Sequence, residues 1–185
     1  MKTFWIEHEM KYDGTQLKSL FAYMNYRVQG DSIVSWIGPC DIPNEHIVDG
    51  EDLLAGEKIC GAKMLHFIVE KFHISLFTAV TLQRLLSAIA MDLVRQKSST
   101  KTVIREGDDI FVDDGKLSIS IATLSPVSGL IHFAINISNE GTPVKTASLG
   151  DLGIDPIAFS KTLMSKFTEE LSGIENATTK VRPVR

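Results

Sequence analysis

The chain has 185 residues, of which 44% are hydrophobic and 23% charged, a mix typical of one ordinary globular domain. Its net charge of -4 at pH 7 gives no general attraction to nucleic acid or anionic membrane, so neither is expected as a partner. Two cysteines, Cys40 and Cys60, are too few for a disulfide framework and form no CxxC pair, which predicts reduced thiols, no zinc site and a cytoplasmic location.

The N-terminal half is predicted to contain three strands, over residues 2–10, 32–37 and 64–69. A helix over residues 16–26, capped by Thr15, is predicted by apolar side chains at helical spacing, which are Leu17, Leu20, Phe21 and Met24. Gly38-Pro39 is expected to stop the second strand. The polar stretch 40–63 that follows is interpreted as a long loop, and loops of that length often carry function.

In the C-terminal half, an apolar helix is predicted over residues 76–96; its interior Gln83, Arg84 and Asp92 favour a buried helix over a membrane span. Four strands are expected over 103–104, 109–112, 116–123 and 130–138. Asp155-Pro156 should begin a helix that ends near Gly173. This order predicts an α+β fold with a mainly antiparallel sheet flanked by helices. We expect a single domain over 1–175 and a basic tail over 176–185.

Asp114-Gly115 predicts a two-residue hairpin turn. That turn would pair Asp113 with Lys116 and Asp109 with Ser120, and would gather the polar residues of the hairpin on one face, namely Lys116, Asp109, Ser118 and Ser120. Ile119 and Ile121 would then point into the core. A fixed cation above small polar side chains suits a carboxylate or phosphate ligand. The alternative is that this face only meets water, and a one-residue bulge would reverse the facing.

Several segments resemble the catalytic domain of biotin and lipoate protein ligases. Lys116-Leu-Ser-Ile-Ser-Ile is similar to their lysine strand, Asp108-Asp109-Ile-Phe-Val to their Asn-Asp-Leu/Ile-Tyr segment, and Ala134-Ile-Asn136-Ile to their Gly-Ile-Asn-Val. Tyr12-Asp13-Gly14-Thr15-Gln16 lies where those enzymes place an Asp-Ser-Thr-Asn turn. Four further segments are Gly38-Pro39-Cys40-Asp41, Met64-Leu65-His66-Phe67, Ser118-Ile-Ser-Ile-Ala-Thr and Thr178-Thr179-Lys180-Val181-Arg182-Pro183. By these segments the whole chain resembles a small uncharacterised prokaryotic family, domain of unknown function family 366. The fold that this resemblance implies is that of the biotin/lipoate ligase and class II synthetase group.

By the resemblance, Lys116 and Asp109 would be catalytic, with Lys116 steadying negative charge on an acyl or phosphoryl oxygen. Asn136 would bond near the phosphate, and Ser118 and Ser120 would contact the ligand. The sequence departs from the ligases, because it lacks their glycine- and arginine-rich phosphate loop and has Ile119 where they have glycine. ATP and Mg²⁺ are candidate cofactors, a small molecule is the expected ligand, and a homodimer is left open.

Other candidates come from the residues themselves. His46 and Asp49, with Asp41, Glu45 and Asp52 nearby, could bind a divalent cation or serve as acid and base in a hydrolase, or could simply belong to a solvated acidic loop. His132 shares a strand face with Asn136 and could border the ligand site, whereas His66 is interpreted as a core histidine. In the basic tail, Lys180 and Arg182 could fold back onto an anionic ligand. The functions left open are a ligase or acyl/nucleotidyl transferase, a non-catalytic binding module, and a hydrolase.

Overall fold

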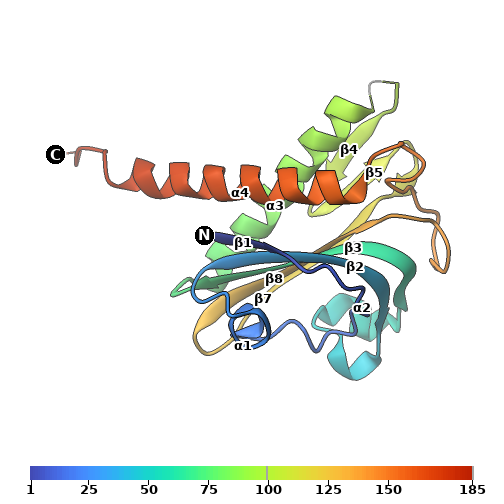
Figure 1. Ribbon diagram of the computed structural model, residues 1–185, viewed down its shortest axis with the longest axis horizontal. Coiled ribbons are helices and arrows are strands. Elements are labelled where there is room, and N and C mark those ends of the chain that lie inside the picture. The colour runs from blue at the N-terminus through green and yellow to red at the C-terminus, as the bar shows by residue number, and fades with distance from the viewer. Residues whose placement is uncertain (99, 185) are drawn as a thin grey trace.

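A five-stranded sheet forms the centre of the molecule (Figure 1). The computed structural model describes residues 1–98 and 100–184. The strands lie in the order β1-β2-β3-β8-β7, with β1 and β2 parallel and the other pairs antiparallel. Their bounds are β1 Lys2–Trp5, β2 Ser32–Ile42, β3 Ile59–Phe72, β8 Ser128–Asn136 and β7 Ser118–Leu124.

A second, three-stranded sheet lies beside the first in the order β4-β5-β6. Its strands are β4 Val103–Glu106, β5 Asp109–Val112 and β6 Gly115–Lys116. Two long helices, α3 and α4, cover one face of the main sheet, and three short helices lie toward the other face (Figure 1). The helices are α1 Phe21–Tyr26, the 3-10 helix η1 Asn44–His46, α2 Gly50–Ala55, α3 Leu76–Lys97 and α4 Pro156–Thr178. The predicted α+β class with a mainly antiparallel sheet is thereby confirmed.

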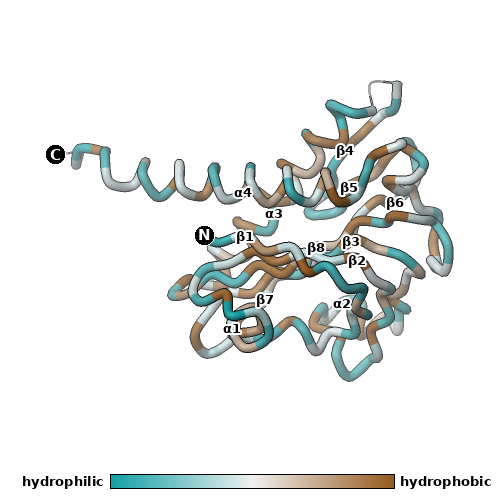
Figure 2. Tube along the Cα trace, in the orientation of Figure 1, coloured by the Kyte–Doolittle hydropathy of each residue, from teal (hydrophilic) through white to brown (hydrophobic). Residues whose placement is uncertain are grey.

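The sheet has an apolar layer on each face, because successive strand residues point to opposite sides. On the helix side, Phe67 and Phe133 pack against the buried stripes of α3 and α4. On the other side, Trp36 packs with Phe21 and with Tyr12 from the N-terminal segment. Figure 2 shows hydrophobic residues running along the central strands below α3 and α4. Only the second layer continues into the site described below.

Helix α3 is the one helix, among residues 1–98 and 100–184, whose length and composition would allow it to cross a membrane. Its buried side chains, which include Leu86, Ala90 and Val94, pack into the apolar layer between α3, α4 and the sheet. The Ser75 hydroxyl accepts the Thr78 N–H and caps its first turn. The helix is therefore a core element of the fold, as its interior polar residues predict.

Strand β2 does not stop at Gly38-Pro39 as predicted. It continues to Ile42 through an irregularity in its pairing with β3, between Gly38 and Cys40. The backbone of Met10 crosses so closely that a Cβ added at Gly38 would lie 1.9 Å from its oxygen. Glycine and proline therefore make a bulge here, and the predicted loop 40–63 shrinks to the segment between β2 and β3.

Two helices differ in length from their predictions. Helix α1 begins at Phe21 instead of Gln16, because Leu20 adopts a left-handed conformation and donates its N–H to the buried carboxylate of Glu70. Helix α4 begins at the predicted Asp155 cap but runs through Gly173 to Thr178. The first three residues of the predicted tail are therefore helical.

Candidate functional site

A cavity of about 370 Å³ lies on the face of the main sheet opposite α3 and α4. Its floor combines β3, β7 and β8 with Tyr12 from the N-terminal segment, and two segments wall it. The first comprises residues 46–60, which follow β2 and include the first two residues of β3, and the second comprises residues 142–146, after β8. The volume lies within the range usual for small-molecule sites.

Lys116 lines this cavity together with Asp109, and the two side chains form an ion pair with an Nζ–Oδ2 distance of 2.8 Å. Each side chain is 31% exposed, so the pair lies at the boundary between protein and open cavity. Burial raises the pKa of Asp109, and the neighbouring Lys116 opposes that effect. Lys116 and Asp109 therefore lie together on one face, as expected.

The hairpin that carries the pair differs from the predicted one. Phe111 pairs with Lys116 and Val112 with Gly115, so the turn residues are Asp113 and Asp114. Gly115 belongs to the strand, because the backbone of residues 146–147 passes so close that a Cβ would meet it at 2.8 Å. The pairing changes by two residues, which preserves the side to which each strand residue points.

Ser118 and Ser120 do not share the face of Lys116, and this part of the hairpin prediction was wrong. The chain moves from one sheet to the other at Leu117, whose N–H donates to Ile110, and the irregularity reverses the alternation. Ser118 is fully buried and accepts the Ile110 N–H. Ser120 still lines the cavity, but its hydroxyl already bonds to Gln83 of α3 and to Asp108.

Ile119 and Ile121 consequently line the cavity instead of the helix-side core. Ile119 packs in the same apolar layer as Tyr12 and Trp36. The floor beside Lys116 is thus apolar, where the sequence predicted hydroxyl groups. An isoleucine at position 119 fills space that a glycine would leave open, so this part of the cavity presents a side chain in place of exposed backbone.

Asn136 and His132 both line the cavity from the same face of β8, as predicted. The side-chain Nδ2 of Asn136 donates to the main-chain oxygens of Lys116 and Ala147 at 3.1 and 3.2 Å. Its role is therefore at least partly to hold β6 and the 145–147 segment together. With both N–H groups used in this way, Oδ1 is the atom left for a ligand.

His132 belongs to a buried stack of aromatic rings. The Tyr12 ring lies parallel to it with centroids 3.6 Å apart, and His66 donates or accepts a hydrogen bond with it at 3.1 Å. Both histidines are almost completely buried. Burial lowers the pKa of His66 to about 4, and burial followed by the proximity of His66 lowers the pKa of His132 well below its usual value. Both rings are neutral at pH 7.

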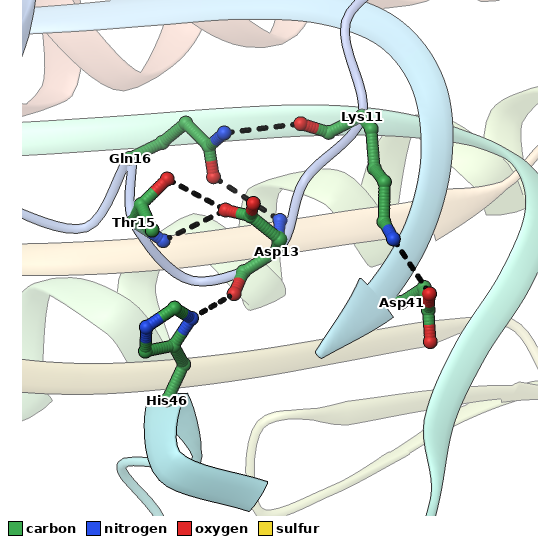
Figure 3. Close-up of polar contacts among 6 residues, drawn as sticks. All are labelled: Lys11, Asp13, Thr15, Gln16, Asp41 and His46. Carbon is green, nitrogen blue, oxygen red and sulfur yellow. Dashed lines mark hydrogen bonds and ion pairs between the residues drawn. The ribbon is translucent and has the colours of Figure 1, made fainter. Parts of the chain in front are cut away.

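Tyr12 lies over the floor and belongs to a tight turn, whose residues Lys11, Asp13, Thr15 and Gln16 are drawn in Figure 3. The Asp13 carboxylate accepts from the N–H and hydroxyl of Thr15, and Gln16 bonds back to the backbone on either side of Tyr12. The ring Nδ1 of His46 donates to the main-chain oxygen of Asp13 at 2.8 Å. His46 therefore joins the 46–60 wall to the turn. This turn corresponds to the segment 12–16 singled out in the sequence.

The wall formed by residues 46–60 is strongly acidic. Asp49 caps α2 by accepting the N–H groups of Glu51 and Asp52. Burial, followed by the nearby charge of Asp49, raises the pKa of Asp52. In total the cavity is lined by six carboxylates, which are Asp49, Glu51, Asp52, Glu57, Asp108 and Asp109, against two lysines, Lys58 and Lys116. Among residues 1–98 and 100–184, no three His, Cys, Asp or Glu side chains are arranged to hold a metal ion.

Neither Cys40 nor the basic residues Lys180 and Arg182 line the cavity. Cys40 is buried, and burial raises the pKa of its thiol to about 12, so it stays protonated. The basic tail does not fold back: Figure 1 shows α4 carrying it away from the sheet and from α2. Lys180 and Arg182 are exposed, and neither lines the cavity.

The site includes residues that sequence reasoning did not select. Tyr12 comes from a segment far from the hairpin, and Ile119 was assigned to the core. Only Tyr12 carried a usable signal, because it precedes the Asp-Gly turn that resembles a ligase turn. The position of Asp52 follows from helix α2, which the polar stretch 40–63 did not reveal.

Comparisons with solved structures identify the fold. A structure titled as a protein of unknown function from Pyrococcus horikoshi superposes with a TM-score of 0.92 and is 38% identical, over 99% of this chain and all of that one. A biotin protein ligase variant from Aquifex aeolicus in complex with biotin has a TM-score of 0.61 at 13% identity, over 93% and 70%. A candidate lipoate protein ligase from T. acidophilum with bound lipoic acid has a TM-score of 0.52 at 14% identity, over 92% and 86%. The fold is that of the biotin/lipoate ligases.

Sequence comparisons identify the family. An uncharacterized protein from Methanocaldococcus jannaschii is 31% identical over 191 residues, which span all of this chain and 86% of that protein. Residues 1–182 match the family described as Domain of unknown function (DUF366). The resemblance inferred from the sequence is confirmed, and the chain belongs to the DUF366 family.

Proposed function

We propose that the cavity binds a small organic molecule with a carboxylate or acyl group, and that Lys116 is the cation which receives that group. The observation that carries the proposal is the position of Lys116. Its ammonium group stands at the edge of the cavity, which the apolar side chain of Ile119 also lines. An amphipathic acid could place its charged end on the lysine and its apolar part on the floor.

The fold supports the same class of ligand. Structures with this fold contain biotin and lipoic acid, which are both carboxylic acids with a short acyl chain attached to a ring. In a ligase or acyl/nucleotidyl transferase, a cation at the acyl oxygen stabilises the negative charge that develops during transfer. Asp109 would orient Lys116 for that role through their ion pair.

Charge favours an acyl ligand over a free nucleotide. Six lining carboxylates face two lysines, so a triphosphate would meet net repulsion unless divalent cations accompanied it. A nucleotide would therefore bind as a complex with Mg²⁺. The experiment below tests ATP with Mg²⁺ as a cofactor. A carboxylate carries a single charge, which one lysine can balance.

A non-catalytic binding module is the second candidate. Lys116 is already paired with Asp109, and the buried Cys40 thiol is held protonated by its raised pKa. Neither observation prevents binding. The ion pair means that Lys116 is not an unengaged catalytic cation, and the protonated thiol means that Cys40 is not a ready nucleophile. The hydrolase alternative has less support, because His46 holds the Tyr12 turn and Asp49 caps α2.

Thermal-shift measurements with biotin, lipoate and octanoate, each with and without ATP and Mg²⁺, test the proposal. A ligand at one hundred times its dissociation constant stabilises the fold by about 2.7 kcal/mol. We expect such a shift with at least one acid, and its loss in Lys116→Gln. The matched control is Lys101→Gln, because Lys101 forms an exposed ion pair with Asp113 outside the cavity.

Turnover separates the two candidates. Release of pyrophosphate from ATP in the presence of the stabilising acid supports a ligase-type reaction, and saturable binding without release supports the binding module. An unchanged ligand response in Lys116→Gln, equal to that of Lys101→Gln, would refute the role of the lysine.

A further inference from the structure

A chain of hydrogen bonds runs below the cavity floor from strand β2 to strand β8. His66 Nε2 lies 3.1 Å from the main-chain oxygen of Gly38, and His66 Nδ1 lies 3.1 Å from His132 Nε2. His66 is fully buried and His132 is 2% exposed. The rings of Tyr12, Trp36 and both histidines stack around this chain, which holds the imidazole planes in place.

The hydrogen bond to the Gly38 oxygen determines which nitrogens carry protons in both histidine rings. A carbonyl oxygen can only accept, so the proton that bonds to Gly38 belongs to Nε2 of His66. A neutral imidazole has one N–H, which makes His66 Nδ1 an acceptor. The Nε2 of His132 must then donate to it. Since His132 is also neutral, its remaining nitrogen, Nδ1, carries a lone pair and no proton.

The side chain that carries this lone pair lines the cavity. His132 is a lining residue, and its Nδ1 has no hydrogen-bond partner in the described part of the chain. Among the described residues, the fully buried side-chain oxygen and nitrogen atoms that lack a hydrogen-bond partner are the hydroxyls of Ser35, Ser87 and Ser160. His132 Nδ1 is not one of them, so it is not fully buried in the core. Tyr12, whose ring covers that of His132, also lines the cavity, and its hydroxyl has no hydrogen-bond partner in residues 1–98 and 100–184.

We propose that His132 Nδ1 is a fixed hydrogen-bond acceptor which selects ligands carrying an N–H or O–H group at the floor of the cavity. The inference rests on the proposed function for the location of the ligand, and it adds a requirement that Lys116 does not impose. A ligand without a donor would leave the buried nitrogen unpaired after displacing water, which makes its binding unfavourable. The chemical class is therefore an acid or acyl compound with an amide, ureido, amino or hydroxyl group in the part that reaches β8.

A purely structural histidine pair would be built differently. Two buried imidazoles that served only the core would be expected to end on protein partners at both ends, because an unpaired buried acceptor has a cost. Here one end reaches Gly38 and the other reaches the cavity. The main-chain oxygen of Gly38 thus determines, through the two histidines, that an acceptor nitrogen faces the surface where a ligand would lie.

Nuclear magnetic resonance tests the tautomers directly. In protein labelled with ¹⁵N histidine, two-bond proton–nitrogen correlations distinguish protonated from unprotonated ring nitrogens. At pH 7 we expect His66 and His132 to be neutral, with the proton on Nε2 and a bare Nδ1. A proton on Nδ1 of His132, or a doubly protonated ring, would overturn the inference. This measurement uses the unaltered chain and requires no ligand.

Two fragments without a carboxylate test the selection. Imidazolidin-2-one offers N–H donors, and cyclopentanone has a similar ring with none. We expect only the first to shift the Nδ1 resonance of His132, and the shift to be unchanged in Lys116→Gln. Equal shifts from both fragments, or none at saturating concentration, would refute the acceptor role. Because neither fragment needs Lys116, failure here is distinct from failure of the proposed acid-binding function.

Variants add a second readout. His132→Phe keeps a stacking ring but removes the acceptor, so the preference for imidazolidin-2-one over cyclopentanone should fall at least about tenfold, corresponding to one lost hydrogen bond. His132→Gln, whose amide can donate to His66 and still accept from a ligand, should retain part of that preference. A preference that survives intact in His132→Phe would contradict the inference.

Discussion

Acidification should destabilise this protein through its buried histidine pair. His66 has a pKa of about 4 in the folded protein, because burial disfavours its charged form. An unfolded chain restores a value of about 6.5. Between these values the unfolded state binds a proton that the folded state does not, so stability is retained above pH 6.5 and lost as the pH falls toward 4.

The size of the loss follows from the same two values. At pH 5 the difference in proton binding by His66 lowers the free energy of unfolding by about 2 kcal/mol relative to neutral pH. His132 contributes in the same direction, since its pKa is also lowered by burial. Asp52 and Asp109 act oppositely, because their pKa values are raised in the folded state. Comparison with a variant is therefore needed to isolate the histidine contribution.

Urea unfolding at pH 7 and pH 5, followed by tryptophan fluorescence, measures this contribution. Trp36 is fully buried with its ring centroid 5.2 Å from that of His66, so it reports directly on this region. We expect His66→Gln to lose about 2 kcal/mol less than the unaltered chain on acidification. The exposed His8→Gln should behave like the unaltered chain. Equal losses in His66→Gln and the unaltered chain would refute the argument.

Two further predictions concern stability and can be checked by the same urea method. Gly38→Ala should cost about 3 kcal/mol or more, because the new Cβ would overlap the oxygen of Met10, whereas Gly173→Ala, with open space around it, should stabilise α4 by up to about 1 kcal/mol. Equal effects of the two changes would contradict the role of the bulge. Glu70→Gln should cost about 1.5–3 kcal/mol, because the buried carboxylate accepts the N–H that precedes α1 and a serine hydroxyl. The exposed Glu9→Gln is its control, and a similar cost there would refute the assignment.

Local signals predicted most elements of the fold. The bounds of β5 match the prediction, α3 begins at the predicted Leu76, and Asp155 caps α4 as expected. These features depend on neighbours a few residues apart, such as the Asp155 carboxylate and the Ala158 N–H. Periodicity and capping rules therefore suffice for them.

The remaining differences arise from contacts distant in sequence. Gly115 belongs to β6 because residues 146–147 cross it, and β2 passes Gly38 because Met10 crosses there. The residues around the two glycines do not indicate these crossings. Gly115 was therefore interpreted as part of a turn, and Gly38 as the end of a strand. The facing of Ser118 depends in the same way on the change of sheet at Leu117.

For the candidate site, sequence patterns found the cation and missed much of its surroundings. Lys116 and Asp109 were correctly placed on one face although their strand partners were wrong, because a shift of two residues leaves strand facing unchanged. The apolar floor at Ile119 and the carboxylate of Asp52 could not be predicted, since each depends on tertiary packing around the cavity. The hydrogen-bond chain through His66 also requires the pairing of β3 with β8, which no local rule supplies.

The acidic lining gives salt an unusual influence on binding. An anion in the cavity meets a lining with six carboxylates and two lysines, and mobile ions screen the net repulsion over about 10 Å at 0.1 M ionic strength. Added salt therefore helps an anion to arrive and hinders a cation, which reverses the behaviour of an ordinary lysine-rich anion site. The direction in which affinity moves with ionic strength thus reports the sign of the ligand's charge before its identity is known.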